Sequence, residues 1–78
     1  MSDEPDPATI GGRLRIARTL RGVGSRELSA AIGLSPAAVS RIETDPTLDP
    51  KLSTIRAIAE VLRCAPGWLA FGEGRAPR

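Results

Sequence analysis

Arginine is the residue type in this sequence with the clearest capacity to bind another molecule. Ten of the eleven basic residues are arginine. A guanidinium group presents a flat, two-pronged set of N–H donors that matches a phosphate group or the acceptor edge of guanine. Three of the nine acidic residues, Asp3, Glu4 and Asp6, fall within the first eight positions, so the rest of the chain carries eleven basic and six acidic side chains, a net charge of +5. This balance favours a polyanionic partner such as a nucleic acid.

The sequence lacks the side chains that most enzymes and metal sites use. It contains no histidine and no tyrosine, its serines have no recognisable general base, and no pair of carboxylates suggests a raised pKa. The single cysteine, Cys64, cannot form an intramolecular disulfide, and without histidine it cannot complete a cysteine–histidine zinc site. Gly11 and Gly12 lie near the start of an expected helix and not after a strand, so they do not indicate a phosphate-binding glycine loop. We therefore expect no catalysis, no cofactor and no metal.

Length and composition bound the organisation of the chain. Its 78 residues are enough for one small domain. Residues 1–8 combine three acids with two prolines and predict a disordered acidic tail, residues 9–72 predict the folded domain, and residues 73–78 a flexible C-terminal tail. The longest uncharged stretch near the end, residues 64–72, is far shorter than the roughly 20 residues of a membrane helix, and the acidic N-terminus does not fit a secretory signal. We expect a cytoplasmic protein without a membrane partner.

Apolar residues recur at helical spacing along the domain, and strand-like alternation is absent from the sequence. This pattern predicts an all-α fold of four to five helices. The first helix lies between Thr9, a candidate N-cap, and Gly22, which can adopt the left-handed conformation that ends a helix. Its apolar stripe comprises Ile10, Leu14, Ala17 and Leu20. Residues 25–32 predict a short second helix, which Gly33 closes.

A short connection separates the second helix from the third. Serine caps free amides and proline is tolerated at the first helical position, so Ser35 and Pro36 predict a helix over residues 36–43. The connection, residues 33–35, begins with glycine and forces a sharp crossing instead of an antiparallel hairpin. The opposite side of the third helix, around Arg41, then stays free, and a helix presented in this way fits the DNA major groove, which is about 12 Å wide. The side chains that we expect to share one core are Leu28, Ile32, Leu34, Val39 and Ile42.

The rest of the domain predicts a loop and two further helices. Residues 44–50 contain two prolines and two aspartates without a helical period, which indicates a loop. Asp49 and Pro50 repeat the cap-then-proline signal before a helix of about three turns. Pro66 can open a last short helix over residues 67–71. The apolar stripe of the fourth helix comprises Leu52, Ile55, Ile58, Ala59 and Leu62.

Several segments, taken in order, match a known family. They are IGGRLRIAR at residues 10–18, EL at 27–28, IGLS at 32–35, VSRIE at 39–43, the proline before the fourth helix, IAEVL at 58–62 and WLAFGEG at 68–74. Through them the chain resembles the phage repressor and Cro type of helix-turn-helix domain, also called XRE-like, over residues 10–74. The resemblance implies a repressor-like fold and a sequence-specific transcriptional regulator. It also implies a homodimer that reads an inverted-repeat operator in double-stranded DNA with the third helix in the major groove.

The same resemblance implies which residues contact DNA. Groups at the start of the second helix bind a phosphate in such domains, which assigns this role to Ser25 and Arg26; contacts of this kind position the protein without reading sequence. The exposed side of the third helix reads bases, and the residues in or near the groove would be Ser35, Ala37, Ala38, Ser40 and Arg41. Arg41 is the candidate for a bidentate contact with guanine, and a solvated surface charge is the alternative. Lys51 is either a phosphate ligand or a free surface lysine.

Further positions of the family pattern imply structural roles. Arg18 and Glu43 would form an ion pair that links the first helix to the third. Cys64 is interpreted as a core thiol, with a redox switch as the alternative. The bulky C-terminal residues serve either the core of the domain itself or a symmetric dimer interface; they are Trp68, Leu69 and Phe71.

Three departures from the family pattern bear on DNA binding. Gly24 and Ser25 replace the usual capping residue and glutamine at the start of the second helix. Residues 44–49 form a stiff, acidic loop where the family loop is basic or glycine-rich, and this loop would repel a nearby phosphate. Residues 36–38 offer no long polar side chain, although alanine methyls can meet thymine methyls. We expect moderate affinity and a sequence preference that depends on Arg41. The alternative function is an antitoxin-like or adaptor module whose main partner is another protein.

Overall fold

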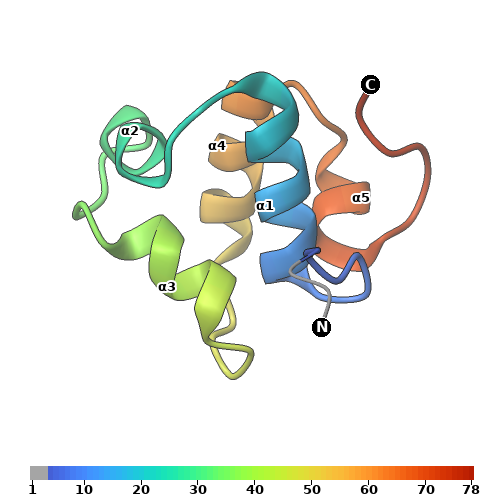
Figure 1. Cartoon of the computed structure of the whole chain (residues 1–78), viewed down its shortest axis with the longest axis horizontal. Coiled ribbons are helices and arrows are strands. Elements are labelled where there is room, and N and C mark those ends of the chain that lie inside the picture. Colours follow the sequence, from blue (N-terminus) through green and yellow to red (C-terminus); the bar gives the residue numbers. More distant parts are fainter. Residues whose placement is uncertain (1–3) are drawn as a thin grey trace.

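The computed structural model describes residues 4–78. This part of the chain folds into five α-helices and contains no β-strand (Figure 1). The helices are α1 (Ile10–Arg21), α2 (Ser25–Ala31), α3 (Ala38–Thr44), α4 (Leu52–Leu62) and α5 (Pro66–Phe71). The predicted all-α fold of four to five helices is confirmed. The disorder predicted for residues 1–3 lies outside the described residues.

Helix α1 begins and ends as the sequence predicts. The hydroxyl of Thr9 accepts a hydrogen bond from the amide of Gly12 at 2.9 Å, which satisfies one of the free donors of the first turn. Gly22 adopts a left-handed conformation with φ of +67° and donates its N–H to the carbonyls of Arg18 and Thr19. These two caps fix the ends of the helix on which the other elements pack.

The predicted start of the third helix is wrong by two residues. Helix α3 begins at Ala38, and Ser35 makes no side-chain cap; its carbonyl instead accepts the N–H of Ala38 at 3.0 Å in a turn that contains Pro36. The reason lies in α2, where the hydroxyl of Ser29 accepts the amide N–H of Val39 at 3.1 Å. A side chain from the neighbouring helix therefore takes the place of the local cap.

The predicted start of the fourth helix is also wrong by two residues. Helix α4 begins at Leu52, its N-cap residue is Lys51, and no side chain caps it. The chain stays extended through Lys51, with φ of −62° and ψ of 149°. The first helical turn consequently lies beyond Asp49 and Pro50, and the expected cap by Asp49 is not formed.

The apolar core lies between α1, α4 and α5 and extends under α2 and α3. Helix α1 packs on α3, α4 and α5, and α2 packs on α3 and α4. Figure 1 shows α2 and α3 on one side of the molecule and α5 on the opposite side. The buried apolar residues are Leu14, Ala17, Leu28, Val39, Ile55, Ile58, Ala59, Leu62, Trp68 and Leu69.

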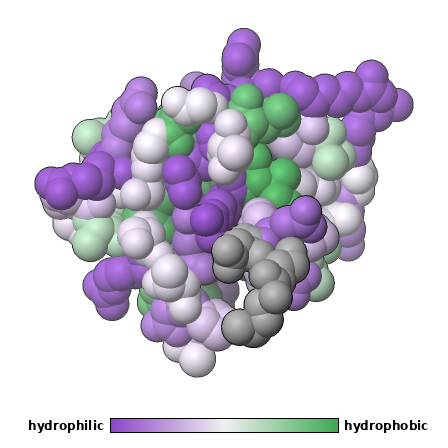
Figure 2. All heavy atoms as spheres, in the orientation of Figure 1, coloured by the Kyte–Doolittle hydropathy of each residue, from purple (hydrophilic) through white to green (hydrophobic). Residues whose placement is uncertain are grey.

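Three leucines that the sequence analysis expected in the core or in the apolar stripe of a helix lie at the surface. Leu34 is 40% exposed because it belongs to the turn between α2 and α3, where its N–H bonds to the carbonyl of Ser29. Leu52 is 59% exposed because it is the first residue of α4, one turn before the buried Ile55. Leu20 is 48% exposed near the end of α1. Figure 2 views the molecule from the same side as Figure 1, and there hydrophilic residues are widespread while apolar residues are exposed in small patches.

Two arginines of α1 bind the C-terminal ends of other helices. Arg13 is only 5% exposed, and its guanidinium donates to the carbonyls of Leu69 and Ala70 in α5, at 2.9 and 3.1 Å, and to Pro7 at 2.7 Å. Arg21 donates to the carbonyl of Leu62 at 2.7 Å and to two carbonyls further along the chain. A cation at a helix C-terminus donates to free carbonyls and interacts favourably with the negative end of the helix dipole. The sequence pattern did not reveal these roles.

Cys64 is half-buried and packs against the core, and this burial raises the pKa of its thiol.

Within residues 4–78, no helix combines the length and the apolar composition that crossing a bilayer requires.

Candidate nucleic-acid interface

Helices α2 and α3 are joined by a tight turn that makes them cross. Gly33 has φ of +74°, a conformation that a side chain would strain. The next amide, of Leu34, donates to the carbonyl of Ser29 at 2.9 Å and closes the end of α2. The predicted crossing is therefore built from one left-handed glycine and one backbone hydrogen bond, and it leaves the far side of α3 uncovered.

The buried Ser29 hydroxyl links the two helices. It donates to the carbonyl of Ser25 at 2.9 Å and accepts the amide N–H of Val39 at 3.1 Å. Ser29 is fully buried, and its hydroxyl forms one hydrogen bond as donor and one as acceptor. Removing the hydroxyl would therefore leave the amide of Val39, at the start of α3, without a partner. Sequence reasoning missed Ser29; the available signal is a serine beside Leu28 on the buried face of a short helix.

The expected ion pair between Arg18 and Glu43 is present and bidentate. Nε of Arg18 lies 2.8 Å from Oε2 of Glu43, and Nη2 lies 3.0 Å from Oε1. The side chains are 18% and 8% exposed, and the third guanidinium contact goes to the carbonyl of Val23. The hydrogen bonds that Arg18 donates to Glu43 raise the pKa of Arg18, against a smaller opposing effect of burial. This pair holds the C-terminal end of α3 on α1.

The residues to which the family resemblance assigned base reading lie on α3 and in the turn before it. Ser35, Ala37, Ser40 and Arg41 are exposed and Ala38 is half-buried. Within residues 4–78, Arg41 makes no ion pair and no side-chain hydrogen bond. Its five N–H donors are therefore available to an external acceptor.

The three candidate phosphate ligands occupy different settings. Arg26 is exposed in the first turn of α2, whereas Ser25 is half-buried and its carbonyl already accepts the Ser29 hydroxyl. Lys51 is exposed at the N-cap of α4. It lines a shallow pocket between the α2–α3 turn and α4, together with Ile32 and Leu34. Two of the three candidates, Arg26 and Lys51, are thus exposed cations, one on α2 and one at the start of α4.

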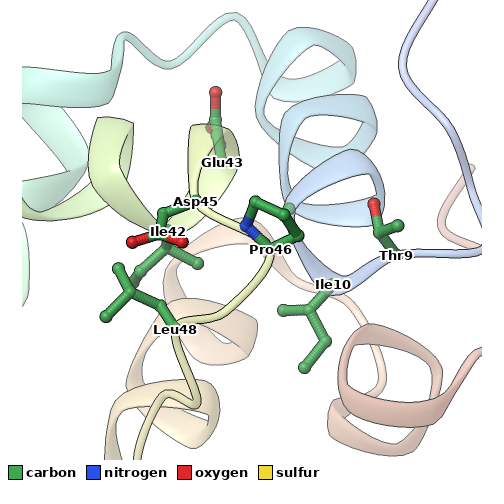
Figure 3. A pocket seen from close by; sticks show the side chains of 8 residues that line it. Thr9, Ile10, Ile42, Glu43, Asp45, Pro46 and Leu48 are labelled. Atoms are coloured by element: carbon green, nitrogen blue, oxygen red, sulfur yellow. The ribbon is translucent and has the colours of Figure 1, made fainter.

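The loop after α3 forms a second pocket against the start of α1. This pocket has a volume of about 230 Å³, and Figure 3 shows Pro46 between the start of α1 and the end of α3. Oδ1 of Asp45 accepts the N–H of Thr47 at 2.9 Å and its hydroxyl at 2.6 Å. These bonds lower the pKa of Asp45, and attraction to Arg41 adds a smaller effect in the same direction. Of the two aspartates in this loop, Asp45 is thus held by hydrogen bonds at the end of α3.

Comparison with known proteins identifies the family. The helix-turn-helix family model matches residues 14–69, which span most of the folded domain. The chain belongs to the helix-turn-helix family. Within this family it is similar to the HTH-type transcriptional regulator DicA of Escherichia coli (strain K12), with 34% identity over 65 residues. That match covers 83% of this chain and 47% of DicA, so the chain spans about half the length of this relative.

Solved structures place the domain with the phage repressors. The P22 c2 repressor, crystallised with the synthetic operator 9T, superposes with a TM-score of 0.74 at 26% identity, over 83% of this chain and 97% of that chain. The restriction-modification controller protein C.AhdI from Aeromonas hydrophila superposes with a TM-score of 0.70 at 30% identity, over 82% and 96%. The chain is a helix-turn-helix domain of the phage repressor, XRE-like type, a family of DNA-binding transcriptional regulators.

The C-terminal residues of this helix-turn-helix domain divide into two groups. Trp68 is 7% exposed and Leu69 is fully buried, so both pack in the core of their own subunit. Phe71, the last residue of α5, is 71% exposed. Of the three residues considered for a dimer interface, Phe71 alone is largely exposed.

Proposed function

We propose that this domain is a sequence-specific regulator of transcription that binds double-stranded DNA as a homodimer, most simply a repressor or a Cro-like protein. The observation that carries the proposal is the exposed, unpaired Arg41 on a helix held at both ends. Ser29 fixes the start of α3 and the Arg18–Glu43 pair fixes its end. The rigid support gives the side chain of Arg41 a defined starting position from which it can reach a base edge.

The relatives support this assignment. The P22 c2 repressor shares the fold and is known with an operator, and DicA is a transcriptional regulator. By analogy, α3 lies in the major groove and Arg41 contacts guanine through O6 and N7. Ser25, Arg26 and Lys51 contact phosphates and set the register of the domain. Ala37 and Ala38 can contribute only apolar contacts, such as those with thymine methyls.

A homodimer would match an inverted repeat. Two copies related by a two-fold axis present two α3 helices, which read half-sites about one helical turn of DNA apart. The exposed Phe71 is the side chain that supports a contact between copies. Burying an aromatic side chain stabilises an interface, so we assign Phe71 to the symmetry axis.

The alternative function is an antitoxin-like or adaptor module whose main partner is another protein. The exposed Phe71 also supports this version, because an aromatic side chain on the surface suits a protein interface of either kind. The two versions differ in their DNA requirement. Only the first predicts a preferred DNA sequence that depends on Arg41.

The test is a selection of bound fragments from a random DNA pool, followed by titration of the enriched duplex at two salt concentrations. We expect an enriched palindrome and a steep salt dependence. Arg41→Ala should weaken binding to this duplex by about 10- to 100-fold and relax the preference at one position of each half-site. Arg56→Ala removes the same charge from an exposed position on α4 and serves as the matched control.

Each outcome discriminates between the two functions. A preference that is lost in Arg41→Ala and kept in Arg56→Ala supports a sequence-reading regulator. An enriched palindrome that Arg41→Ala leaves intact would remove the assigned role of Arg41. A folded protein that enriches no sequence would favour the protein-partner version.

A further inference from the structure

The loop after α3 holds one carboxylate at a fixed position next to the reading helix. Asp45 is the C-cap of α3, and its N–H donates to the carbonyl of Arg41 at 2.9 Å, so the two residues are one helical turn apart. Oδ1 of Asp45 accepts two hydrogen bonds from Thr47, from the amide at 2.9 Å and from the hydroxyl at 2.6 Å. This carboxylate therefore has a defined place, unlike a free surface aspartate.

The fixed carboxylate and Arg41 influence each other without forming an ion pair. Arg41 makes no salt bridge in the described part of the chain. Its charge nevertheless acts on Asp45, because attraction to Arg41 is one cause of the lowered pKa of Asp45, after the two bonds from Thr47. The Asp45 charge acts equally on any anion that approaches Arg41. The end of the reading helix thus combines one free cation with one fixed anion.

We propose that Asp45 is a specificity-determining residue that directs Arg41 away from phosphates and toward a base edge. The inference rests on the proposed function. A free arginine on a reading helix can bind either an anionic phosphate or the neutral acceptors O6 and N7 of guanine. A carboxylate one turn away repels the phosphate, whereas it has little effect on a neutral base edge. Asp45 therefore weakens sequence-independent binding more than sequence-specific binding.

The role of Thr47 follows from the same geometry. Its two hydrogen bonds stop the carboxylate from turning away when a phosphate approaches. A mobile aspartate could rotate away from Arg41, and its repulsion of a phosphate bound there would fall with the distance. Thr47 is accordingly a positioning residue for Asp45 and does not itself contact DNA.

The test compares two duplexes of equal length, one enriched from a random pool and one with the same bases scrambled. Binding of the full chain is measured by fluorescence anisotropy at two salt concentrations. Asp45→Asn removes the charge and keeps an oxygen that can accept both bonds from Thr47. We expect it to tighten binding to the scrambled duplex by about fivefold at low salt and to change binding to the enriched duplex by less than about twofold. The specificity ratio is the affinity for the enriched duplex divided by the affinity for the scrambled duplex. Thr47→Ala keeps the charge of Asp45 and should lower this ratio, but by less than Asp45→Asn does.

Two controls separate this effect from a general change in charge. Asp49→Asn alters the same loop by the same charge, and Asp49 is exposed and makes no hydrogen bond within residues 4–78. Asp49→Asn should change the affinity for both duplexes by the same factor. In an Arg41→Ala background, Asp45→Asn should leave the specificity ratio unchanged, because no side chain remains to be redirected.

The outcomes separate this inference from the proposed function. Asp45 has no special role if Asp45→Asn strengthens binding to both duplexes equally, or if Asp49→Asn changes the specificity ratio as much as Asp45→Asn does. In either case the domain still reads sequence. If the wild-type protein binds both duplexes equally, the proposed function fails and this inference fails with it.

Discussion

Gly11 lies so close to the backbone of Glu43 that a methyl group on Gly11 would fall 2.8 Å from the Glu43 carbonyl oxygen. The carbonyl oxygen of Ile42 would be equally near. Only glycine allows the start of α1 to approach the end of α3 in this way. The contact and the Arg18–Glu43 ion pair hold the same end of α3, so packing and electrostatics fix the position of this helix together.

Substitution of Gly11 by alanine should destabilise the domain. Alanine favours a helix more than glycine does, but its methyl group would have to displace the backbone of α3. We expect the free energy of unfolding, measured by urea denaturation, to fall by about 1–3 kcal/mol, as for other overpacked sites. Gly67→Ala is the matched control, because Gly67 lies in α5 with open space around its Cβ position. It should be neutral or stabilising, and a Gly11→Ala protein as stable as this control would contradict the close approach.

Ser29→Ala should also lower stability, through the amide of Val39. This buried N–H loses its acceptor when the hydroxyl is removed, and a buried donor without a partner costs about 1–3 kcal/mol. Urea denaturation measures the loss. Ser53→Ala, on the exposed side of α4, should change the free energy of unfolding by less than about 0.5 kcal/mol. Equal small effects in the two variants would show that Ser29 does not cap α3.

Residues 25–44 show how far the sequence determines the fold and the site. The helical spacing of apolar residues within each segment predicted that Leu28 of α2 and Val39 of α3 are buried, because this spacing marks the face of a helix that packs on the core. It could not predict that Ser29 would replace Ser35 as the cap of α3, because that bond joins two helices and depends on their crossing. The position of Arg18 opposite Glu43 came from resemblance to a family and not from spacing.

The two arginines that bind helix ends could not be predicted for a related reason. A buried arginine is usually expected opposite a carboxylate, and Arg13 instead finds three carbonyls contributed by α5 and the N-terminal segment. Nothing local to Arg13 distinguishes it from the exposed Arg15, two residues further along the same helix. Long-range backbone acceptors become visible only when the helices are in place.

Arg13→Lys should therefore cost much more than Arg15→Lys. A lysine ammonium is a compact point charge and cannot reproduce the planar fork that reaches Leu69, Ala70 and Pro7. We expect a loss of about 1–3 kcal/mol in the free energy of unfolding for Arg13→Lys, since at least one buried carbonyl loses its donor. Arg15→Lys, at an exposed position, should change it by less than about 0.5 kcal/mol. Indistinguishable urea midpoints for the two variants would mean that charge alone, without the fork, stabilises the end of α5.

The stability of the loop after α3 should depend on acid pH through Asp45. The pKa of its carboxyl lies below the ordinary value of 3.8, first because the Thr47 hydroxyl and then because the Thr47 amide bonds to the charged form. A group whose pKa is lower in the folded state stabilises that state above the unfolded pKa, and this contribution is lost as the pH falls through the folded pKa. The contribution should therefore be complete at neutral pH and absent well below pH 3.8.

Asp45→Asn isolates this contribution, since the amide oxygen can still accept both hydrogen bonds but never ionises. The difference in free energy of unfolding between wild type and Asp45→Asn should favour the wild type near neutral pH. It should shrink toward zero as the pH falls through the lowered pKa of Asp45 in the folded state, below which both side chains are uncharged. Other carboxylates titrate alike in the two proteins and cancel in the difference. A difference that stays constant from neutral to acid pH would mean that the charged form of Asp45 gains nothing from Thr47 in the folded state.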